Sequence, residues 1–299
     1  MQPEHLPVFC RWILSRLNTT IGQTIAQMEA YDFSHATSSI YAFWQYDLCD
    51  VFIELVKPVI WSGDEAAMKP TRDTLWACLE IGLRLLHPFM PFLTEELWQR
   101  LPKDPSYAKT FPSITVSEYP KVANAFVNAA LEKDFAYQAI IVNRIRSIRM
   151  TYGLTSSKQK PDVYLQCSAE AFERLSPLAP YIAALSTSAK VECVLAGAGA
   201  GAGSIPKGCC VAIVDDAVSA HVVLTGLVDP AKEIQRLEKK RLDTETRKAA
   251  VSKKMAMPDY GKTPDKIKED DRERLTKFET ELASIAEAIQ GFQTLTIEG

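Results

Sequence analysis

The chain has 299 residues, of which 47% are hydrophobic and 24% charged, and its formal net charge is −3. This length suffices for two or three domains, and the charge excludes a global basic field, so nucleic-acid binding would need a local basic stripe. The seven Cys and four His include no CxxC pair, which argues against a disulfide framework and against a zinc site.

Apolar residues at spacings of three and four predict amphipathic helices through the first half of the chain. Asp32 or Ser34 caps the second of them, which is expected to stop before Lys57-Pro58. Each helix has one apolar stripe to bury, so a helical bundle is the economical arrangement. The helices are predicted at residues 12–28, 34–55, 74–87, 94–101 and 124–150.

An apolar elbow interrupts this pattern at HPFMPFLTEELWQRL, residues 87–101. Pro88 and Pro91 predict a bend between two helices. A short helix is then expected to begin at Thr94. Its predicted buried residues are Leu97, Trp98 and Leu101.

The pattern changes near Gly153 to a small α+β module. Alternating and β-branched runs predict strands, and two short apolar segments predict helices between them. AGAGAGAGS at residues 196–204 offers no side chain to bury, so it is expected to be a flexible loop. The strands are predicted at 162–167, 191–195, 210–214 and 220–225, and the helices at 169–175 and 177–185.

The last segment predicts an antiparallel coiled-coil arm. Asp229-Pro230 and Thr263-Pro264 are helix starts, with the turn residues 258–261 between them. The facing seam residues weaken toward the tip, so the distal end is expected to be loosely held. The two seams are Leu275, Phe278, Leu282, Ile285, Ile289 and Phe292, against Ile234, Leu237, Arg241, Thr244, Lys248 and Val251.

These patterns predict a mainly α chain: a helical-bundle domain at residues 1–154, an α+β module at 155–227 and a coiled-coil arm at 228–299. No apolar stretch reaches the roughly 18 residues of a membrane span. Residues 1–10 lack a signal-peptide pattern, so a cytoplasmic location is expected.

The first helix of the arm carries the clearest charge feature, a local excess of basic side chains that suits a phosphate backbone. A solvated coiled-coil face is the structural alternative, since mixed Lys and Glu are ordinary there. The candidate phosphate-binding residues are Lys232, Arg236, Lys239, Lys240, Arg241, Arg247, Lys248, Lys253 and Lys254.

Two further clusters have competing interpretations. Arg144, Arg146 and Arg149 suit phosphates, but pairing with carboxylates is favoured for such bundle arginines. Trp12, between Arg11 and Arg16, suits base stacking if it is exposed, whereas core packing is the default for Trp. The carboxylates considered as partners are Asp47, Asp50 and Glu54. The tryptophans at 44, 61, 76 and 98 are likewise expected in the core.

Signals of catalysis are missing from the sequence. The Gly-Ala run has no following Lys-Ser/Thr, so it is not a phosphate-binding loop, and no GxSxG nucleophile motif occurs. No His stands within a short run of potential ligands, and no metal site is predicted. We therefore expect no enzymatic activity and no cofactor on this chain.

Three segments, RWILSRL (11–17), FWQYDLCDVFIELVKP (43–58) and LLHPFMPFLTEELWQRLP (85–102), resemble the anticodon-binding helical domain of class I aminoacyl-tRNA synthetases. The His-Pro-Phe-Met-Pro run and VNRIRSIRMTYGL (142–154) resemble the valine, isoleucine and leucine branch. GLVDPAKEIQRLEKKR (226–241) and the hairpin after it resemble the C-terminal arm of the valyl-tRNA synthetase family, most like eukaryotic cytosolic forms.

The resemblance implies a fragment that binds valine tRNA and positions it for ATP-dependent aminoacylation by catalytic and editing domains that lie outside this sequence. The HIGH and KMSKS signatures of the catalytic domain do not occur here, and Met1 is then either internal or introduced. ATP and Mg²⁺ belong to the catalytic part. The anticodon loop is expected at Arg11, Trp12, Arg16, Leu75 and Trp76, and the arm is expected at the corner of the tRNA.

Two alternatives stay open from the sequence. One is a helical scaffold whose arm docks another protein, such as a component of the translation machinery. The other is the equivalent fragment of an isoleucyl- or leucyl-tRNA synthetase, although the Cys-rich ending typical of the isoleucine enzyme is missing. Salt-dependent tRNA binding separates the first alternative from the main prediction.

Overall fold

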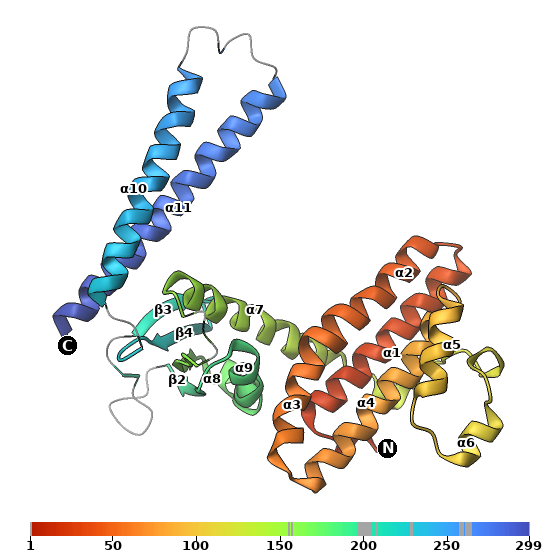
Figure 1. The fold of residues 1–299 in the computed structure, drawn as a ribbon. Helices are drawn as coiled ribbons and strands as arrows, with labels where there is room; N and C mark the ends of the chain where they lie inside the picture. The colour runs from red at the N-terminus through yellow and green to blue at the C-terminus, as the bar shows by residue number, and fades with distance from the viewer. Residues whose placement is uncertain are drawn as a thin grey trace. The chain divides into compact units, whose positions relative to one another are not determined.

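The computed structural model describes residues 2–154, 156, 158–196, 205–206, 209–227, 230–256, 260 and 265–298. Helices dominate and a four-stranded sheet accompanies them (Figure 1), which confirms the predicted fold class. The chain divides into two compact units, unit 1 (Met1–Ala139) and unit 2 (Ile140–Gly299), and helix α7 (Ala129–Thr151) contributes to both. The division into domains 1–154, 155–227 and 228–299 stays a prediction.

Unit 1 is a helical bundle centred on α1 (Val8–Glu29). This helix packs against α2 (Phe33–Ala42), α4 (Glu65–Leu86) and the π-helical segment η2 (Phe43–Phe52). The spacing of its apolar residues turns one stripe of α1 inward, and burial of that stripe stabilises the bundle. Fully buried side chains at its centre include Phe9, Ile13, Leu17, Ile21, Phe43 and Phe52.

The second helical stretch is longer than the sequence predicted. α2, η2 and α3 (Ile53–Ser62) follow one another without a break, and Pro58 lies inside α3. The prediction that the helix stops before Lys57-Pro58 is wrong, because one missing N–H removes a single hydrogen bond from the ladder. The helix ends instead at Gly63, whose φ of 71° is the left-handed conformation that suits glycine.

The next helix also begins earlier than predicted. α4 starts at Glu65 instead of Thr74, because the Asp64 carboxylate caps it by accepting the Ala66 N–H at 3.0 Å. After the elbow, α5 (Pro91–Arg100) starts at Pro91, the first-turn position that proline favours.

α5 buries only part of its predicted apolar face. Trp98 is buried against Leu83 and Ile114, as expected. The prediction that Leu97 is buried is wrong: its side chain is 44% exposed. Consecutive positions on a helix lie about 100° apart, so packing Trp98 turns Leu97 away from the same contact. Unit 1 also contains α6 (Pro105–Thr110) and the short 3₁₀ turns η1 (Pro3–His5), η3 (Ile114–Val116) and η4 (Asn124–Phe126).

The sheet of unit 2 has the strand order β2-β1-β4-β3. β1 pairs with β2 in parallel and with β4 antiparallel, and β3 pairs antiparallel with β4. Residues 197–204 of the predicted Gly-Ala loop lie outside the described residues. The elements are β1 (Asp162–Cys167), α8 (Ala169–Leu175), η5 (Ser176–Leu178), α9 (Ala179–Ser186), β2 (Lys190–Leu195), β3 (Cys209–Ile213) and β4 (Val218–Val223).

The arm consists of α10 (Pro230–Met255) and α11 (Asp265–Glu298), which pack along each other. Asp229 and most of the predicted turn and second start, residues 257–259 and 261–264, lie outside the described residues. The predicted seams are confirmed in part: Leu237, Thr244, Ile285 and Ile289 are buried, whereas Arg241 is exposed. Among the helices that the structure describes, no apolar stretch has the length of a membrane span.

The distal end of the arm contains a buried polar cluster that the seam pattern did not predict. Asp271 of α11 is only 2% exposed. Its Oδ2 lies 2.7 Å from Lys254 Nζ, at the end of α10, and accepts a hydrogen bond from the Tyr260 hydroxyl at 3.0 Å. This cluster joins Lys254 of α10 and Tyr260 to Asp271 of α11, a contact that the expectation of a loosely held tip did not include; that expectation stays a prediction.

Candidate nucleic-acid interface

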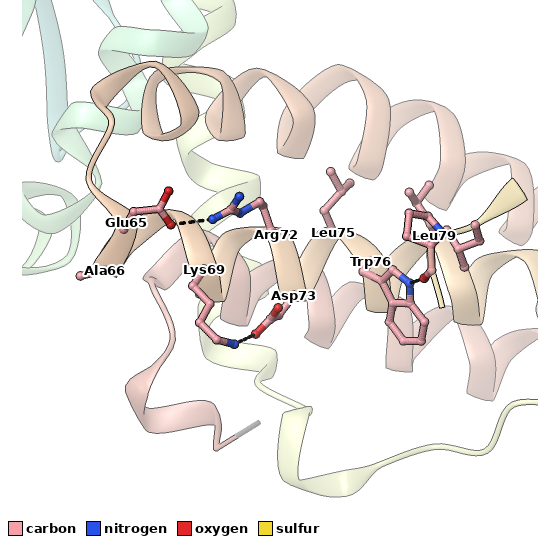
Figure 2. A pocket seen from close by; sticks show the side chains of 10 residues that line it. Glu65, Ala66, Lys69, Arg72, Asp73, Leu75, Trp76 and Leu79 are labelled. Carbon is pink, nitrogen blue, oxygen red and sulfur yellow. Dashed lines mark hydrogen bonds and ion pairs between the residues drawn. The ribbon is translucent and has the colours of Figure 1, made fainter. Parts of the chain in front are cut away.

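A shallow apolar pocket of about 900 Å³ runs along α4 in unit 1 (Figure 2). Leu75, Trp76 and Leu79 line it together with Leu101 and Pro102, which follow α5. Two of the predicted anticodon-binding residues, Leu75 and Trp76, therefore contribute to one depression. A flat, mostly apolar hollow of this kind can receive the ring of an unpaired base.

The end of this pocket near the start of α4 is lined by charged side chains. Lys69 Nζ lies 2.7 Å from Asp73 Oδ2, and Arg72 Nη2 lies 2.7 Å from Glu65 Oε2, as the dashed lines in Figure 2 show. All four side chains reach solvent. Such surface ion pairs contribute about 0–1 kcal/mol, so a phosphate group can displace the carboxylates at little cost.

Trp76 is held in place at the other end of the pocket. Its indole N–H donates to the Pro102 carbonyl oxygen at 2.6 Å, and its ring meets Tyr107 edge-on, with 5.8 Å between centroids. The Tyr107 hydroxyl donates in turn to the buried Glu80 carboxylate, and burial raises the pKa of Tyr107. The Trp76 donor is thus already used, which leaves the apolar part of its ring for the pocket.

Trp12 lies in the core of unit 1. Its side chain is 5% exposed and stacks on Phe135 of α7, with ring centroids 4.6 Å apart and an interplanar angle of 9°. Stacking on a base would require the indole to leave this contact. The structure therefore favours core packing, the alternative that the sequence left open, and anticodon contact by Trp12 stays a prediction.

Arg16 takes part in a network that joins α1, η2 and α7. Its Nε lies 2.9 Å from Asp47 Oδ2 and its Nη1 lies 3.0 Å from Glu132 Oε2. Ser15 and Thr19 also donate to Glu132. Burial raises the pKa of Asp47, which the Arg16 charge partly offsets. Arg16 is thus engaged with carboxylates inside unit 1.

Arg11 has a different environment. It is half-buried, and its Nε finds no hydrogen-bond partner among the described residues. The structure does not bring Arg11 or Arg16 to the α4 pocket. Their assignment to the anticodon loop stays a prediction.

Trp61 is the one exposed tryptophan among the five. It is 77% exposed in the last turn of α3, so the prediction from the sequence that Trp61 lies in the core is wrong. The signal that would have found it is local: Gly63 ends the helix two residues later, so Trp61 stands at the tip of the α3–α4 hairpin. The pocket lining begins four residues further on, at Glu65.

The two helices of the arm carry opposite charges. α10 has nine Lys or Arg and four Asp or Glu residues, for a net charge of +5. α11 has five basic and nine acidic residues, for a net charge of −4. The net positive charge of the arm therefore lies on α10, whereas α11 is net negative, and the basic pattern of α10 alone did not predict this segregation.

Many of the predicted phosphate-binding residues of α10 are already paired. Lys240 and Lys248 bind Glu281 and Glu279 of α11 at 2.8 and 2.9 Å. Within α10, Arg241 lies 3.7 Å from Glu245 and Arg247 lies 2.9 Å from Asp243. Lys254 is held by Asp271, and the side chain of Lys232 lies outside the described residues. Arg236 is exposed on α10.

Lys239 and Lys253 are exposed and have no ion pair among the residues that the structure describes. They are fourteen positions apart, two heptads, so they share a face of α10. Cations that need not leave a carboxylate are the ones that gain most from a phosphate.

The arginines at the end of α7 have a structural role in unit 2. Arg146 donates from Nε and Nη2 to the Leu185 carbonyl at 3.0 and 2.7 Å, and Arg149 donates to the Ser186 carbonyl at 2.9 Å. These carbonyls end α9, where cations are favourable. The structural alternative is thus supported, but the partners are backbone carbonyls instead of the carboxylates that the sequence suggested. Arg144 is exposed.

Metal binding has no candidate in the described part of the chain, where no three His, Cys, Asp or Glu side chains gather. The seven cysteines are all free thiols. Two of the described surfaces suit a polyanion. The α4 pocket of unit 1, with its exposed cations, suits an unpaired base, and the basic helix α10 of unit 2 suits phosphates.

Comparison with known proteins gives two family matches. Residues 10–165 match the family described as the anticodon-binding domain of tRNA ligase, and residues 229–293 match the valyl tRNA synthetase tRNA binding arm. The chain is 38% identical over 294 residues to a valine–tRNA ligase of Homo sapiens, which covers 97% of this chain and 22% of that protein.

Other relatives also match nearly the whole chain and a minor part of their own length. The chain is 40% identical over 293 residues to a valine–tRNA ligase of Takifugu rubripes, covering 95% of the chain and 23% of the relative. It is 31% identical over 291 residues to that of Thermotoga maritima, covering 97% and 31%. The chain thus spans about a quarter of the length of the first two relatives.

Proposed function

The chain belongs to the family of tRNA ligase anticodon-binding domains and carries the tRNA-binding arm of the valyl-tRNA synthetases, and from this premise we propose that it binds valine tRNA at two places. The α4 pocket of unit 1 receives the anticodon loop, and the basic face of α10 follows the phosphate backbone at the corner of the tRNA. The segregation of charge onto α10 is the observation that supports the second contact most directly.

The chain itself carries no catalytic step in this proposal. ATP-dependent attachment of valine, with its ATP and Mg²⁺, belongs to other parts of a longer protein, as the coverage of the relatives suggests. The contribution of these residues is to hold the tRNA so that its acceptor end reaches a distant active site. Such positioning lowers the barrier by converting an encounter into a unimolecular step. A cytoplasmic location fits this role.

The test uses the unpaired lysines of α10. We expect log affinity for a valine tRNA transcript to fall linearly with log salt, because phosphate contacts release counterions. Replacing both Lys239 and Lys253 by Ala should reduce the magnitude of that slope by about 1.4–1.8, since each contact contributes roughly 0.7–0.9. Fluorescence anisotropy across a salt series measures the slope.

The matched control is Lys109→Ala with Lys133→Ala, which removes the same charge from exposed positions of unit 1. The control should leave the slope unchanged. Binding that does not respond to salt would contradict phosphate contact and favour the protein-docking scaffold. If both double variants reduce the slope equally, the lysines of α10 contact the phosphates no more than other exposed lysines do.

A further inference from the structure

Trp61 is exceptional among the five tryptophans of the chain. Trp12 and Trp98 are buried, and Trp44 and Trp76 are half-buried. Trp61 is 77% exposed, and none of the aromatic contacts among the described residues involves it. A large indole without a packing role is free to stack on a ligand.

The tip that carries Trp61 is held by local hydrogen bonds. The Ser62 hydroxyl donates to the Val59 carbonyl at 2.7 Å and accepts from the Asp64 N–H at 3.2 Å. The connection between α3 and α4 consists of only Gly63 and Asp64. An indole on such a fixed tip loses little conformational freedom when a ligand binds, which favours affinity.

Three exposed cations, each paired with a carboxylate, surround the tip together with Asp64, so a polar ligand fits this tip better than an apolar one. Lys57 Nζ lies 2.5 Å from Glu54 Oε1 on α3, and the exposed Lys69 and Arg72 follow on α4. All three pairs are at the surface, where carboxylates exchange readily for phosphates. An aromatic platform beside several exposed cations is the usual composition of a site for single-stranded nucleic acid.

We propose that Trp61 is a stacking platform for an unpaired base of the RNA loop, next to the pocket on α4. This inference rests on the proposed function and adds a residue that contacts the base. The base lies on the indole face, and its flanking phosphates lie near the cations at the start of α4. Stacking depends little on base identity, so Trp61 supplies affinity and leaves discrimination to the pocket.

The experiment measures binding of the full chain to a valine tRNA transcript and to the same transcript with single abasic nucleotides in its anticodon loop. We expect Trp61→Ala to weaken binding of the intact transcript about tenfold, and Trp61→Phe to restore most of it. One abasic position should weaken the unaltered chain to a similar degree and leave Trp61→Ala unaffected. This non-additivity identifies direct stacking, because a purely structural loss would add to the abasic loss.

The matched control is Tyr31→Ala, which removes an aromatic side chain that is 82% exposed at the tip between α1 and α2. It should not change affinity. Equal binding by the unaltered chain and Trp61→Ala would overturn the role of Trp61 alone and leave the proposed function standing. Absence of tRNA binding by the unaltered chain would overturn both.

Discussion

Gly82 lies on the face of α4 that receives the ring of Trp44. A Cβ at this position would stand 2.8 Å from Cζ2 of that indole, which is closer than side chains tolerate. Gly82→Ala should therefore destabilise unit 1 by about 1–3 kcal/mol, even though alanine favours helix. Urea denaturation followed by circular dichroism measures the change in the free energy of unfolding.

Gly22 in α1 is the matched control. A Cβ there would meet Val122 Cγ2 at 3.5 Å, an ordinary contact, so Gly22→Ala should stabilise the protein by about 0.5–1 kcal/mol. A gain of stability in Gly82→Ala as well would contradict the close approach of Trp44.

Individual side chains also show what the sequence could not predict. Leu75 and Trp76 both line the α4 pocket, but their contact with the anticodon loop stays a prediction. Trp12 and Trp61 differ in burial because Phe135, far along the chain, covers one and no described ring covers the other. Arg16 likewise depends on Asp47 and Glu132, which helical periodicity does not bring together.

At the scale of elements, the tip of the arm depends on Asp271. Its hydrogen bond from Lys254, opposed by burial and helped by Tyr260, holds the pKa of this carboxyl below its usual range. A depressed pKa adds stability above the unfolded value of about 4, and that stability is lost as the pH falls through the lower folded value. We expect the tip to open below about pH 4, and Asp271→Asn to open it at neutral pH. Hydrogen exchange along α10 and α11 measures this opening.

Asp270→Asn serves as the control, since Asp270 is the exposed neighbour on the same helix. It should leave exchange at the tip unchanged. If amide exchange at the tip is as slow in both variants as in the unaltered chain, the buried cluster does not hold the two helices together there.

The presence of a helix could be predicted where the spacing of apolar residues determines it, whereas the residues at which helices begin and end were predicted less well. The seam of the arm followed from heptads, because packing of two amphipathic helices is a periodic problem. The helix end predicted at Pro58 was wrong because the preference of proline for helix ends does not take into account the packing of the rest of the helix. Here Leu55 and Val56 of the same helix are buried. The π-helical hydrogen bonding of η2 has no sequence pattern that the periodicity could detect.

For the whole molecule, two contacts on one RNA should bind more tightly than either alone, because the second contact forms at high effective concentration. We expect the full tRNA to bind at least tenfold more tightly than an isolated anticodon stem-loop. The Lys239 and Lys253 double variant should weaken only the tRNA, whereas Trp61→Ala should weaken both RNAs. Competition titrations with the two RNAs measure these differences.

An equal affinity for tRNA and stem-loop would contradict a second contact. An equal effect of the lysine variant on both RNAs would place those lysines at the anticodon instead. The family resemblance predicted tRNA as the class of partner from the sequence. Which side chains have no ion pair, and could therefore contact the RNA, became clear only from the distances between side chains.

The opposite charges of α10 and α11 also give the arm a permanent electric dipole across its width, since the two helices pack along each other. A polyanion that approaches by diffusion exerts a torque on such a dipole, which turns the lysine-rich edge toward the RNA and the glutamate-rich edge away before any atoms touch. The arm therefore selects the orientation of its encounter complex as well as its strength. The association rate should for this reason fall with ionic strength more steeply than the dissociation rate rises.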